Sequence, residues 1–257
     1  MSMKLSAGRS LLDLLLLMAI GLAPVVCGLL ILMVQVDRKL DEFSRFSATE
    51  AIHGVDQLIQ VLHDSSSRSL HLSGRPCLEV AQQLRSQVVA VPRLRSLALT
   101  RGNQAYCDSV DGEQARAIDQ KLFFNQRLWL AEGDGNCVNT AVLHYRLQER
   151  PYGVIAQVDA RMLQAELLGF ENGIVLVLEF GPNFLWAQGD ADGGMPDQRE
   201  HQVRATSEQF GYSVQAGYPK GHTRQEVLQS MVMTLPSLIL VGILTAGIAH
   251  WGMRRQQ

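Results

Sequence analysis

Residues Leu14–Val36 read LLLLMAIGLAPVVCGLLILMVQV, an unbroken run without a charged side chain. A helix of this length spans roughly 34 Å at about 1.5 Å per residue, which exceeds the ~30 Å hydrocarbon core of a bilayer. The run is also longer than the apolar region of a signal peptide, and no small-x-small cleavage pattern follows it. The stretch therefore predicts an uncleaved transmembrane helix over residues 11–36.

A second apolar run, Met231–Met253, lies near the other end of the sequence and contains one ionisable side chain, His250. Its length and hydropathy predict a second transmembrane helix over residues 231–253. The residues between the two runs are numerous enough to form one domain with its own hydrophobic core. We therefore expect one domain, residues 37–230, held between two membrane helices.

Basic residues flank the two runs on the sides away from this domain. Lys4 and Arg9 precede the first run, and Arg254 and Arg255 follow the second. Because short segments rich in Lys and Arg stay in the cytoplasm, we expect the domain on the periplasmic side of the bacterial inner (plasma) membrane. The expected cytoplasmic ends are residues 1–10 and 254–257.

The expected domain has a mixed and mildly acidic composition. Of the 23 lysines and arginines in the sequence, four lie outside it, whereas of the 25 aspartates and glutamates only Asp13 does. A domain with more acidic than basic residues does not offer the positively charged surface that binding to nucleic acid requires. The composition therefore argues against nucleic acid as a partner.

The spacing of apolar residues in the domain predicts two helices at its start. Val55, Leu58 and Leu62 follow helical spacing, so a long helix is expected to continue from the membrane over residues 37–73. Gly74-Arg75-Pro76 ends this helix, and residues 76–90 suit a second one, because proline is tolerated in the first turn.

The rest of the domain alternates between apolar and polar residues and carries turn signals, which is typical of antiparallel strands. One further short helix is expected at residues 160–168. This order indicates an α+β fold, and at fold level it resembles the PAS-like or Cache-like antiparallel sheet of periplasmic sensors. The expected strands are residues 94–100, 104–109, 128–130, 140–147, 152–158, 174–180, 184–188 and 210–218.

Motifs of common catalytic sites are absent from the sequence. It has no Gly-rich phosphate loop, no His-Glu-x-x-His and no Gly-x-Ser-x-Gly. His53, His63 and His71 share the long helix, but no two of them are four residues apart, as a helical metal-binding pair would be. We therefore expect this chain to be no enzyme and to hold no metal and no cofactor.

Four cysteines divide between the membrane and the domain. Cys27 lies in the first apolar run, whereas Cys77, Cys107 and Cys137 lie in the exported domain, where disulfides persist. Three cysteines permit three single bridges and leave one thiol over. Spacing alone therefore leaves the pairing open.

Three segments of the domain resemble a known family. They are Pro76-Cys77 before a helix, residues 91–97, and Ala105-Tyr106-Cys107-Asp108-Ser109 followed by Gly112. With the topology, they resemble the periplasmic CSS-motif domain, which is named for a Cys-Ser-Ser tripeptide. In that family the domain lies between two membrane helices and precedes a cytoplasmic EAL domain, which hydrolyses cyclic di-GMP.

The resemblance implies a disulfide between Cys77 and Cys107, and it places Cys107, Asp108 and Ser109 where the tripeptide stands. Asp108 replaces the first serine, and a carboxylate beside the sulfur would disfavour the thiolate. Local rigidity favours the same pairing, because Cys137 lies in a Gly-rich turn. The rival bridge between Cys107 and Cys137 closes a loop of equal length, and the partner of Cys137 stays open.

The resemblance further implies a redox-responsive sensory module, related to the input half of a cyclic di-GMP phosphodiesterase and served by the periplasmic thiol-oxidising and thiol-reducing system. The sequence ends at Gln257, where the family would enter its EAL domain, so no residue here is expected to act in phosphodiesterase chemistry. Two alternatives are a sensor of a small periplasmic solute, and a membrane interaction protein with a purely structural disulfide. The small-x-x-x-small patterns Ala19–Ala23 and Gly242–Ala246 predict a homodimer through the transmembrane helices.

Overall fold

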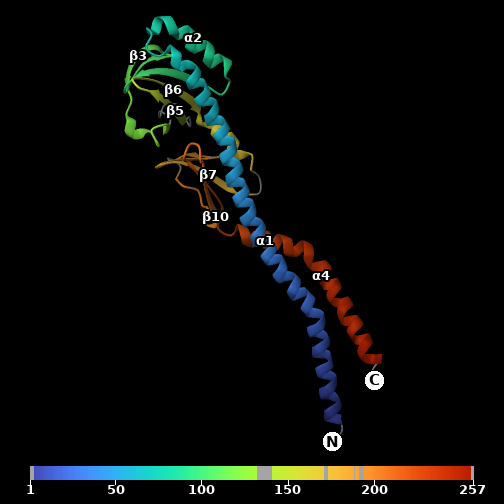
Figure 1. Cartoon of the computed structure of the whole chain (residues 1–257). Helices are drawn as coiled ribbons and strands as arrows, with labels where there is room; N and C mark the ends of the chain where they lie inside the picture. Colours follow the sequence, from blue (N-terminus) through green and yellow to red (C-terminus); the bar gives the residue numbers. More distant parts are fainter. Residues whose placement is uncertain (1–2, 132–140, 171–172, 188, 191–193, 256–257) are drawn as a thin grey trace. The chain divides into compact units, whose positions relative to one another are not determined.

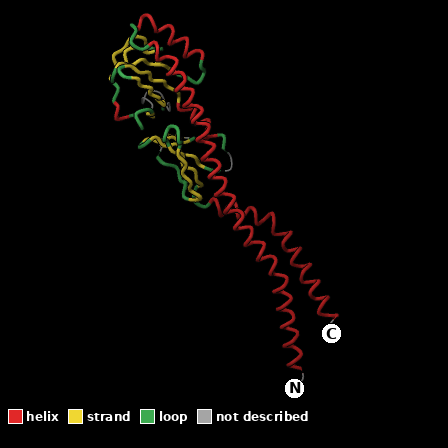
Figure 2. Tube along the Cα trace, viewed as in Figure 1, coloured by secondary structure: helices red, strands yellow, loops and turns green. Residues whose placement is uncertain are grey.

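The computed structural model describes residues 3–131, 141–170, 173–187, 189–190 and 194–255. The chain divides into two compact units. One unit holds Met1–Glu42 and Lys220–Gln257, and the other holds Phe43–Pro219. All described strands, drawn in yellow in Figure 2, belong to the second unit.

Two helices make up the first unit. They are the first part of α1 (Met3–Ser69) and α4 (His222–Arg255). Both helices are long and apolar enough to cross a membrane, by length and composition. Almost no residue of their most apolar stretches is buried inside the protein, as suits side chains that face lipid.

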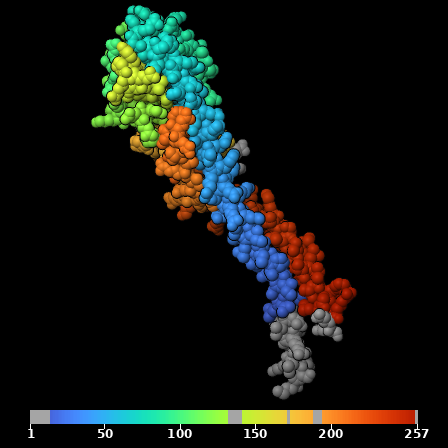
Figure 3. All heavy atoms as spheres, in the orientation of Figure 1, coloured from blue at the N-terminus to red at the C-terminus, as the bar shows by residue number. Residues whose placement is uncertain are grey.

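Small residues bring these two helices together. A methyl group on Gly242 would lie 2.5 Å from the backbone oxygen of Gly21, and one on Gly21 would lie 3.2 Å from Ala246. Gly242 and Ala246, which the sequence analysis assigned to dimerisation, therefore take part in packing within one chain. The space-filling view shows α1 (blue) and α4 (red) in contact (Figure 3).

The second unit contains two antiparallel sheets, where the sequence analysis expected a single one. The first sheet has the strand order β3-β2-β1-β6-β5-β4, and the second has the order β10-β11-β7-β8-β9 (Figure 1). The chain passes from one sheet to the other through α3 (Ala160–Leu168), whose N-terminus is capped by the Asp159 side chain. The remaining helices are α2 (Cys77–Ala90), η1 (Leu70–Leu72) and η2 (Gln120–Leu122).

The strand bounds, in chain order, are β1 (Ser96–Arg101), β2 (Gln104–Asp108), β3 (Gly112–Ala117), β4 (Leu128–Ala131), β5 (Val142–Glu149), β6 (Tyr152–Asp159), β7 (Val175–Phe180), β8 (Asn183–Trp186), β9 (Gly189–Asp190), β10 (Glu200–Thr206) and β11 (Ser213–Tyr218).

Cross-strand register gives the first sheet two different faces. Cys107 pairs with Leu99 and Asp108 pairs with Ala98, which in turn pairs with Ile155. Because successive side chains of a strand point to opposite faces, the Cys107 row and the Asp108 row lie on opposite sides of the sheet. The Cys107 row belongs to the main hydrophobic core, whereas Ala98 and Ile155 belong to a separate small apolar cluster.

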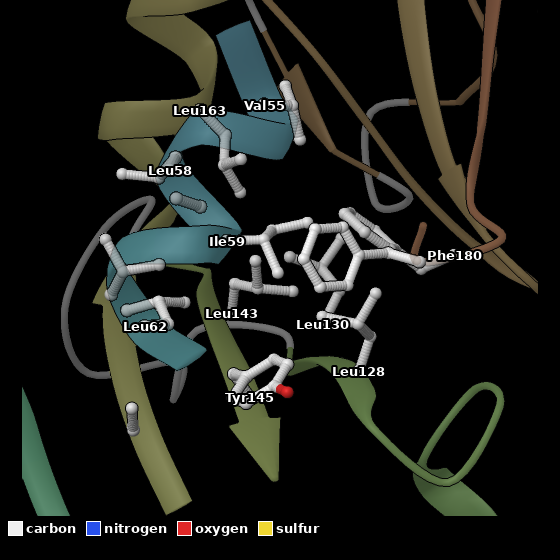
Figure 4. Close-up of a cluster of buried hydrophobic side chains, with 14 of the residues drawn as sticks. Val55, Leu58, Ile59, Leu62, Leu128, Leu130, Leu143, Tyr145, Leu163 and Phe180 are labelled. Atoms are coloured by element: carbon white, nitrogen blue, oxygen red, sulfur yellow. The ribbon is translucent and has the colours of Figure 1, made fainter. Parts of the chain in front are cut away.

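A stripe of α1 forms the centre of the main core. Val55, Leu58, Ile59 and Leu62 are fully buried. Figure 4 shows Ile59 beside the ring of Phe180, and Leu58 and Leu62 of the same core cluster on another side of the helix. Burial of side chains of this size contributes roughly 1.5–3 kcal/mol each. The helical spacing seen in the sequence is therefore the spacing that fills the core.

The structure confirms the α+β class and the long N-terminal helix, but three strands, β3, β9 and β10, were not predicted from the sequence. β9 is a strand of two residues at the edge of the second sheet. β3 reads GEQARA and β10 reads EHQVRAT, and each lies at the edge of its sheet. An edge strand with exposed side chains needs no regular apolar alternation, so the pattern that predicts other strands is missing. Thr140 and Gln188, at the ends of two expected strands, lie outside the described residues.

Replacement of Gly242 by leucine is expected to separate α1 from α4, because a side chain there collides with the backbone of Gly21. A cysteine pair made by Gly28→Cys and Leu238→Cys in a Cys27→Ala background reports on the packing, since the Leu238 side chain lies against Gly28. In membranes we expect this pair to form an intramolecular disulfide, and to lose it in the Gly242→Leu variant.

Gly247→Leu is the matched control on the same helix. Apart from the neighbouring residues and backbone of its own helix, no described residue has an atom within 4 Å of a methyl group at Gly247, so the cross-link should persist. A cross-link that survives Gly242→Leu, or that Gly247→Leu abolishes, would contradict this packing.

Candidate functional site

The two cysteines that the resemblance pairs lie where α2 meets β2. Cys77 is the first residue of α2, and Cys107 lies in β2. A disulfide joins them, with a Cα–Cα distance of 5.3 Å. Cys107 is fully buried and Cys77 is 7% exposed, so the bond belongs to the hydrophobic core. Cys137, the rival partner, lies outside the described residues.

Helical spacing places Cys77 on the buried face of α2. Pro76 precedes the first turn, where the missing N–H of proline removes no hydrogen bond. Val80 and Leu84 follow three and seven residues after Cys77, and both are fully buried. Cys77 is therefore part of the same stripe that packs α2 onto the sheet.

A second contact holds the turn before α2 against β2. The register of β2 shifts at Tyr106 in both of its pairings, which marks a β-bulge. The Tyr106 hydroxyl accepts a hydrogen bond from the backbone N–H of Gly74 at 2.7 Å. Gly74 has a φ of 90°, and a side chain there would meet the ring of Tyr152 at 2.8 Å, so glycine is required. The bulge and this glycine together position the turn that leads to Cys77.

Ser109, which lies two residues after Cys107, connects β1 to α2. Its hydroxyl accepts a hydrogen bond from the Leu97 N–H at 3.0 Å, and its own N–H donates to the Leu97 carbonyl at 2.9 Å. The Ser109 carbonyl accepts a hydrogen bond from Nε of Arg85 on α2 at 2.9 Å. Ser109 is buried, so these bonds satisfy groups that water does not reach.

Asp108 faces away from the disulfide. Its Oδ1 accepts hydrogen bonds from the backbone N–H groups of Val110 at 2.7 Å and Asp111 at 3.4 Å, which closes the turn into β3. Burial raises the pKa of Asp108, and these hydrogen bonds oppose that shift. The sequence analysis expected the Asp108 carboxylate to disfavour a thiolate at Cys107. Since the carboxylate lies on the other face of the sheet, this geometry does not support that effect.

Sequence reasoning missed two residues that support the disulfide. Arg85 lies eight residues after Cys77, on the otherwise buried face of α2, and a charged residue at that position was a usable signal. Tyr106 gave no such signal, because its role depends on a bulge.

Among the described residues, no group of His, Cys, Asp and Glu is arranged to hold a metal. His63 instead lies 2.8 Å from the Tyr145 hydroxyl through its Nδ1.

A protein-family model described as "CSS motif domain associated with EAL" matches residues 44–231. The matched region begins one residue after the start of the second unit, includes both cysteines of the disulfide and ends within α4. No curated protein matches the chain.

The chain is also similar to several solved structures. The sensory domain of the Campylobacter jejuni chemoreceptor Tlp3 matches with a TM-score of 0.47 and 9% identity, over 76% of this chain and 98% of that chain. The periplasmic domain of RsbU from Chlamydia trachomatis matches with a TM-score of 0.46 and 10% identity, over 76% of this chain and 96% of that chain. A methyl-accepting chemotaxis protein X matches with a TM-score of 0.43 and 10% identity, over 73% and 98%.

Reduction of the disulfide is expected to lower the free energy of unfolding by about 3–4 kcal/mol, because the bond closes a loop between residues 30 positions apart. Urea unfolding of the full chain in detergent, with and without a phosphine reductant, measures this difference in a Cys27→Ala background. Cys137→Ala is the control and should retain the full effect of the reductant. Non-reducing peptide mapping that yields a Cys107–Cys137 peptide would contradict the pairing.

Ser109→Ala is expected to lower the free energy of unfolding by about 1–3 kcal/mol, because it leaves the buried N–H of Leu97 without its side-chain acceptor. Ser86→Ala is the matched control, since the exposed Ser86 hydroxyl bonds only to the Gln83 carbonyl of its own helix. Equal stability of the two variants in urea unfolding would show that the Ser109 hydroxyl is not a structural link.

Proposed function

This chain belongs to the family of CSS-motif domains associated with EAL, and we propose that it is a membrane-anchored, non-catalytic sensory module that responds to the thiol–disulfide balance of the bacterial periplasm. The Cys77–Cys107 bond is the proposed sensing element, carried by sheets of the PAS-like or Cache-like kind. The observation that supports this role is the position of the bond, which attaches the first residue of α2 to β2.

Most other contacts of α2 lie farther along the helix. Val80 and Leu84 pack in the core, and Arg85 donates to the Ser109 carbonyl. Gln87 accepts a hydrogen bond from Ser69 of α1. Because these contacts begin one turn after Cys77, opening the disulfide is expected to release the first turn of α2 while the rest of the helix stays in place.

Reduction requires that the sulfurs become accessible. Since Cys107 is fully buried, the first turn of α2 must move off the sheet before a thiolate can attack. A periplasmic dithiol then attacks one sulfur, forms a mixed disulfide and leaves as its own disulfide. Two electrons and two protons pass to Cys77 and Cys107, which become thiols, and an oxidised dithiol partner reverses the step. The accompanying movement of α2 is the proposed signal.

The two apolar helices support a location in the inner membrane, with the second unit in the periplasm. Their exposed apolar stretches are suited to lipid, and the periplasm is a compartment in which disulfides form. Ala19 and Ala23 are exposed on α1 and offer a small-residue surface for a homodimer of membrane helices. The proposed output is an EAL-type cyclic di-GMP phosphodiesterase, because the family is associated with EAL.

Thiol labelling in intact cells tests both the location and the redox response. In a Cys27→Ala, Cys137→Ala background, a membrane-impermeant maleimide is expected to label the protein only after reduction with a phosphine. Equilibration of membranes with mixtures of reduced and oxidised dithiothreitol is expected to give a reduction potential above about −300 mV, since structural disulfides lie below that value.

A variant that also carries Cys77→Ser and Cys107→Ser is the control and should not be labelled. A reduction potential below about −300 mV would identify the bond as a purely structural staple. Labelling that appears only after the cells are permeabilised would contradict the periplasmic location.

A further inference from the structure

The first sheet carries a pocket on the face opposite the disulfide. Its volume of about 550 Å³ falls within the roughly 300–1,000 Å³ that is usual for sites of small molecules. Ala98 and Ile155, which pair across β1 and β6, line its floor together with Asp108. The segment from β3 through η2 to Phe123 lines its side. None of these side chains takes part in the proposed thiol–disulfide exchange.

The end of the pocket over β4 and β5 is aromatic. Trp129 stacks on the ring of His144, with a centroid distance of 4.6 Å and an interplanar angle of 22°. Its ring also lies 5.7 Å from that of Phe123. Trp129 packs against the small apolar cluster that contains Phe123 and Ile155. This end of the pocket therefore suits the apolar part of a ligand.

His144 presents a neutral ring at the aromatic end. The residue is 8% exposed, and its ring makes no hydrogen bond to another described residue. Burial, with the added repulsion of Arg116 and Arg95, lowers the pKa of His144 to about 4. At neutral pH the ring therefore has one N–H to donate and one nitrogen that accepts a hydrogen bond.

Charged groups of both signs line the remainder of the pocket. The guanidinium groups of Arg95 and Arg116 form no ion pair with a described residue. Arg116 acts electrostatically on both Asp108 and His144, so its charge lies within reach of both. Asp108 binds backbone N–H groups through Oδ1, which leaves its other oxygen for a ligand, and Asp111 lines the same side. Across the sheet, Arg116 of β3 is followed by Asp108 of β2 and then by Arg95, which directly precedes β1. The aromatic end lies beyond β6, over β5 and β4.

We propose that this pocket binds a small zwitterion, an α-amino acid with an apolar side chain. The carboxylate of the ligand pairs with Arg95 and Arg116, and its ammonium group pairs with Asp108 and Asp111. Its side chain packs on Trp129 at the aromatic end. A ligand that carries only one of the two charges leaves the opposite charges of the pocket without a partner, which lowers its affinity.

Calorimetric titration of the purified full chain in detergent tests the proposal with L-leucine, L-isoleucine and L-phenylalanine as probes. We expect at least one of the three to bind. The matched carboxylate without the amino group and the matched amine without the carboxylate, phenylpropionate and phenethylamine for L-phenylalanine, should each bind about tenfold or more weakly. Absence of binding by all three amino acids, or equal binding of the matched carboxylate, would overturn the proposal.

Variants of the pocket test where the ligand binds. Arg116→Ala and Asp108→Asn should each weaken binding by about tenfold to a hundredfold, because each removes a charged partner of the ligand. Arg95→Ala, at an exposed position, provides a further test if Asp108→Asn fails to fold.

Arg93→Ala is the matched control, since Arg93 is exposed, lies two residues from Arg95 and does not line the pocket. It should leave the affinity unchanged, and melting temperatures of all variants show whether each is folded. Unchanged affinity in folded Arg116→Ala and Arg95→Ala proteins would overturn the assignment of this pocket.

Discussion

One stripe of α1 side chains packs against both sheets of the domain at once. Val55, Leu58, Ile59 and Leu62 are completely buried in a core that also contains residues of both sheets.

Hydrogen bonds add to the apolar contacts between α1 and the second sheet. Asp56 accepts hydrogen bonds from the Tyr212 hydroxyl at 2.7 Å and the Ser207 hydroxyl at 2.8 Å. Burial, with the neighbouring Asp56, raises the pKa of Tyr212, so its hydroxyl stays a donor. Because the stripe sets how the helix is rotated, it also decides which face of the first sheet is closed by helices and which stays open.

That division of faces gives the residues of the Cys107-Asp108-Ser109 tripeptide three separate roles. Cys107 faces the helices and bonds to α2, whereas Asp108 faces the open side and closes the turn into β3. Ser109 follows the strand and joins β1 to Arg85 of α2. The tripeptide is a unit in the sequence only, because the alternation of a β-strand separates side chains that are neighbours in the chain.

β2 consequently carries both of the inputs that we propose. The disulfide acts on its helix side, and the ligand pocket uses Asp108 on its other side. β2 also lies between β1 and β3, so a change on either face reaches the same hydrogen-bonded neighbours. If the redox state of the disulfide alters the affinity of the pocket, thermodynamic linkage requires the bound ligand to alter the reduction potential by the equivalent free energy.

The sequence by itself determined the two apolar helices, the buried stripe of α1 and the bounds of α3, because each depends on periodicity among residues close together in the chain. The resemblance and local rigidity, not spacing, selected Cys77 and Cys107 from the possible pairs. Only the tertiary structure decided that the strands form two sheets, that Tyr106 lies in a bulge, and that Asp108 turns away from the sulfur. It also brought Arg95, Arg116 and His144 into one pocket. These features depend on the register between strands that are far apart in the chain, which no local pattern of residues encodes.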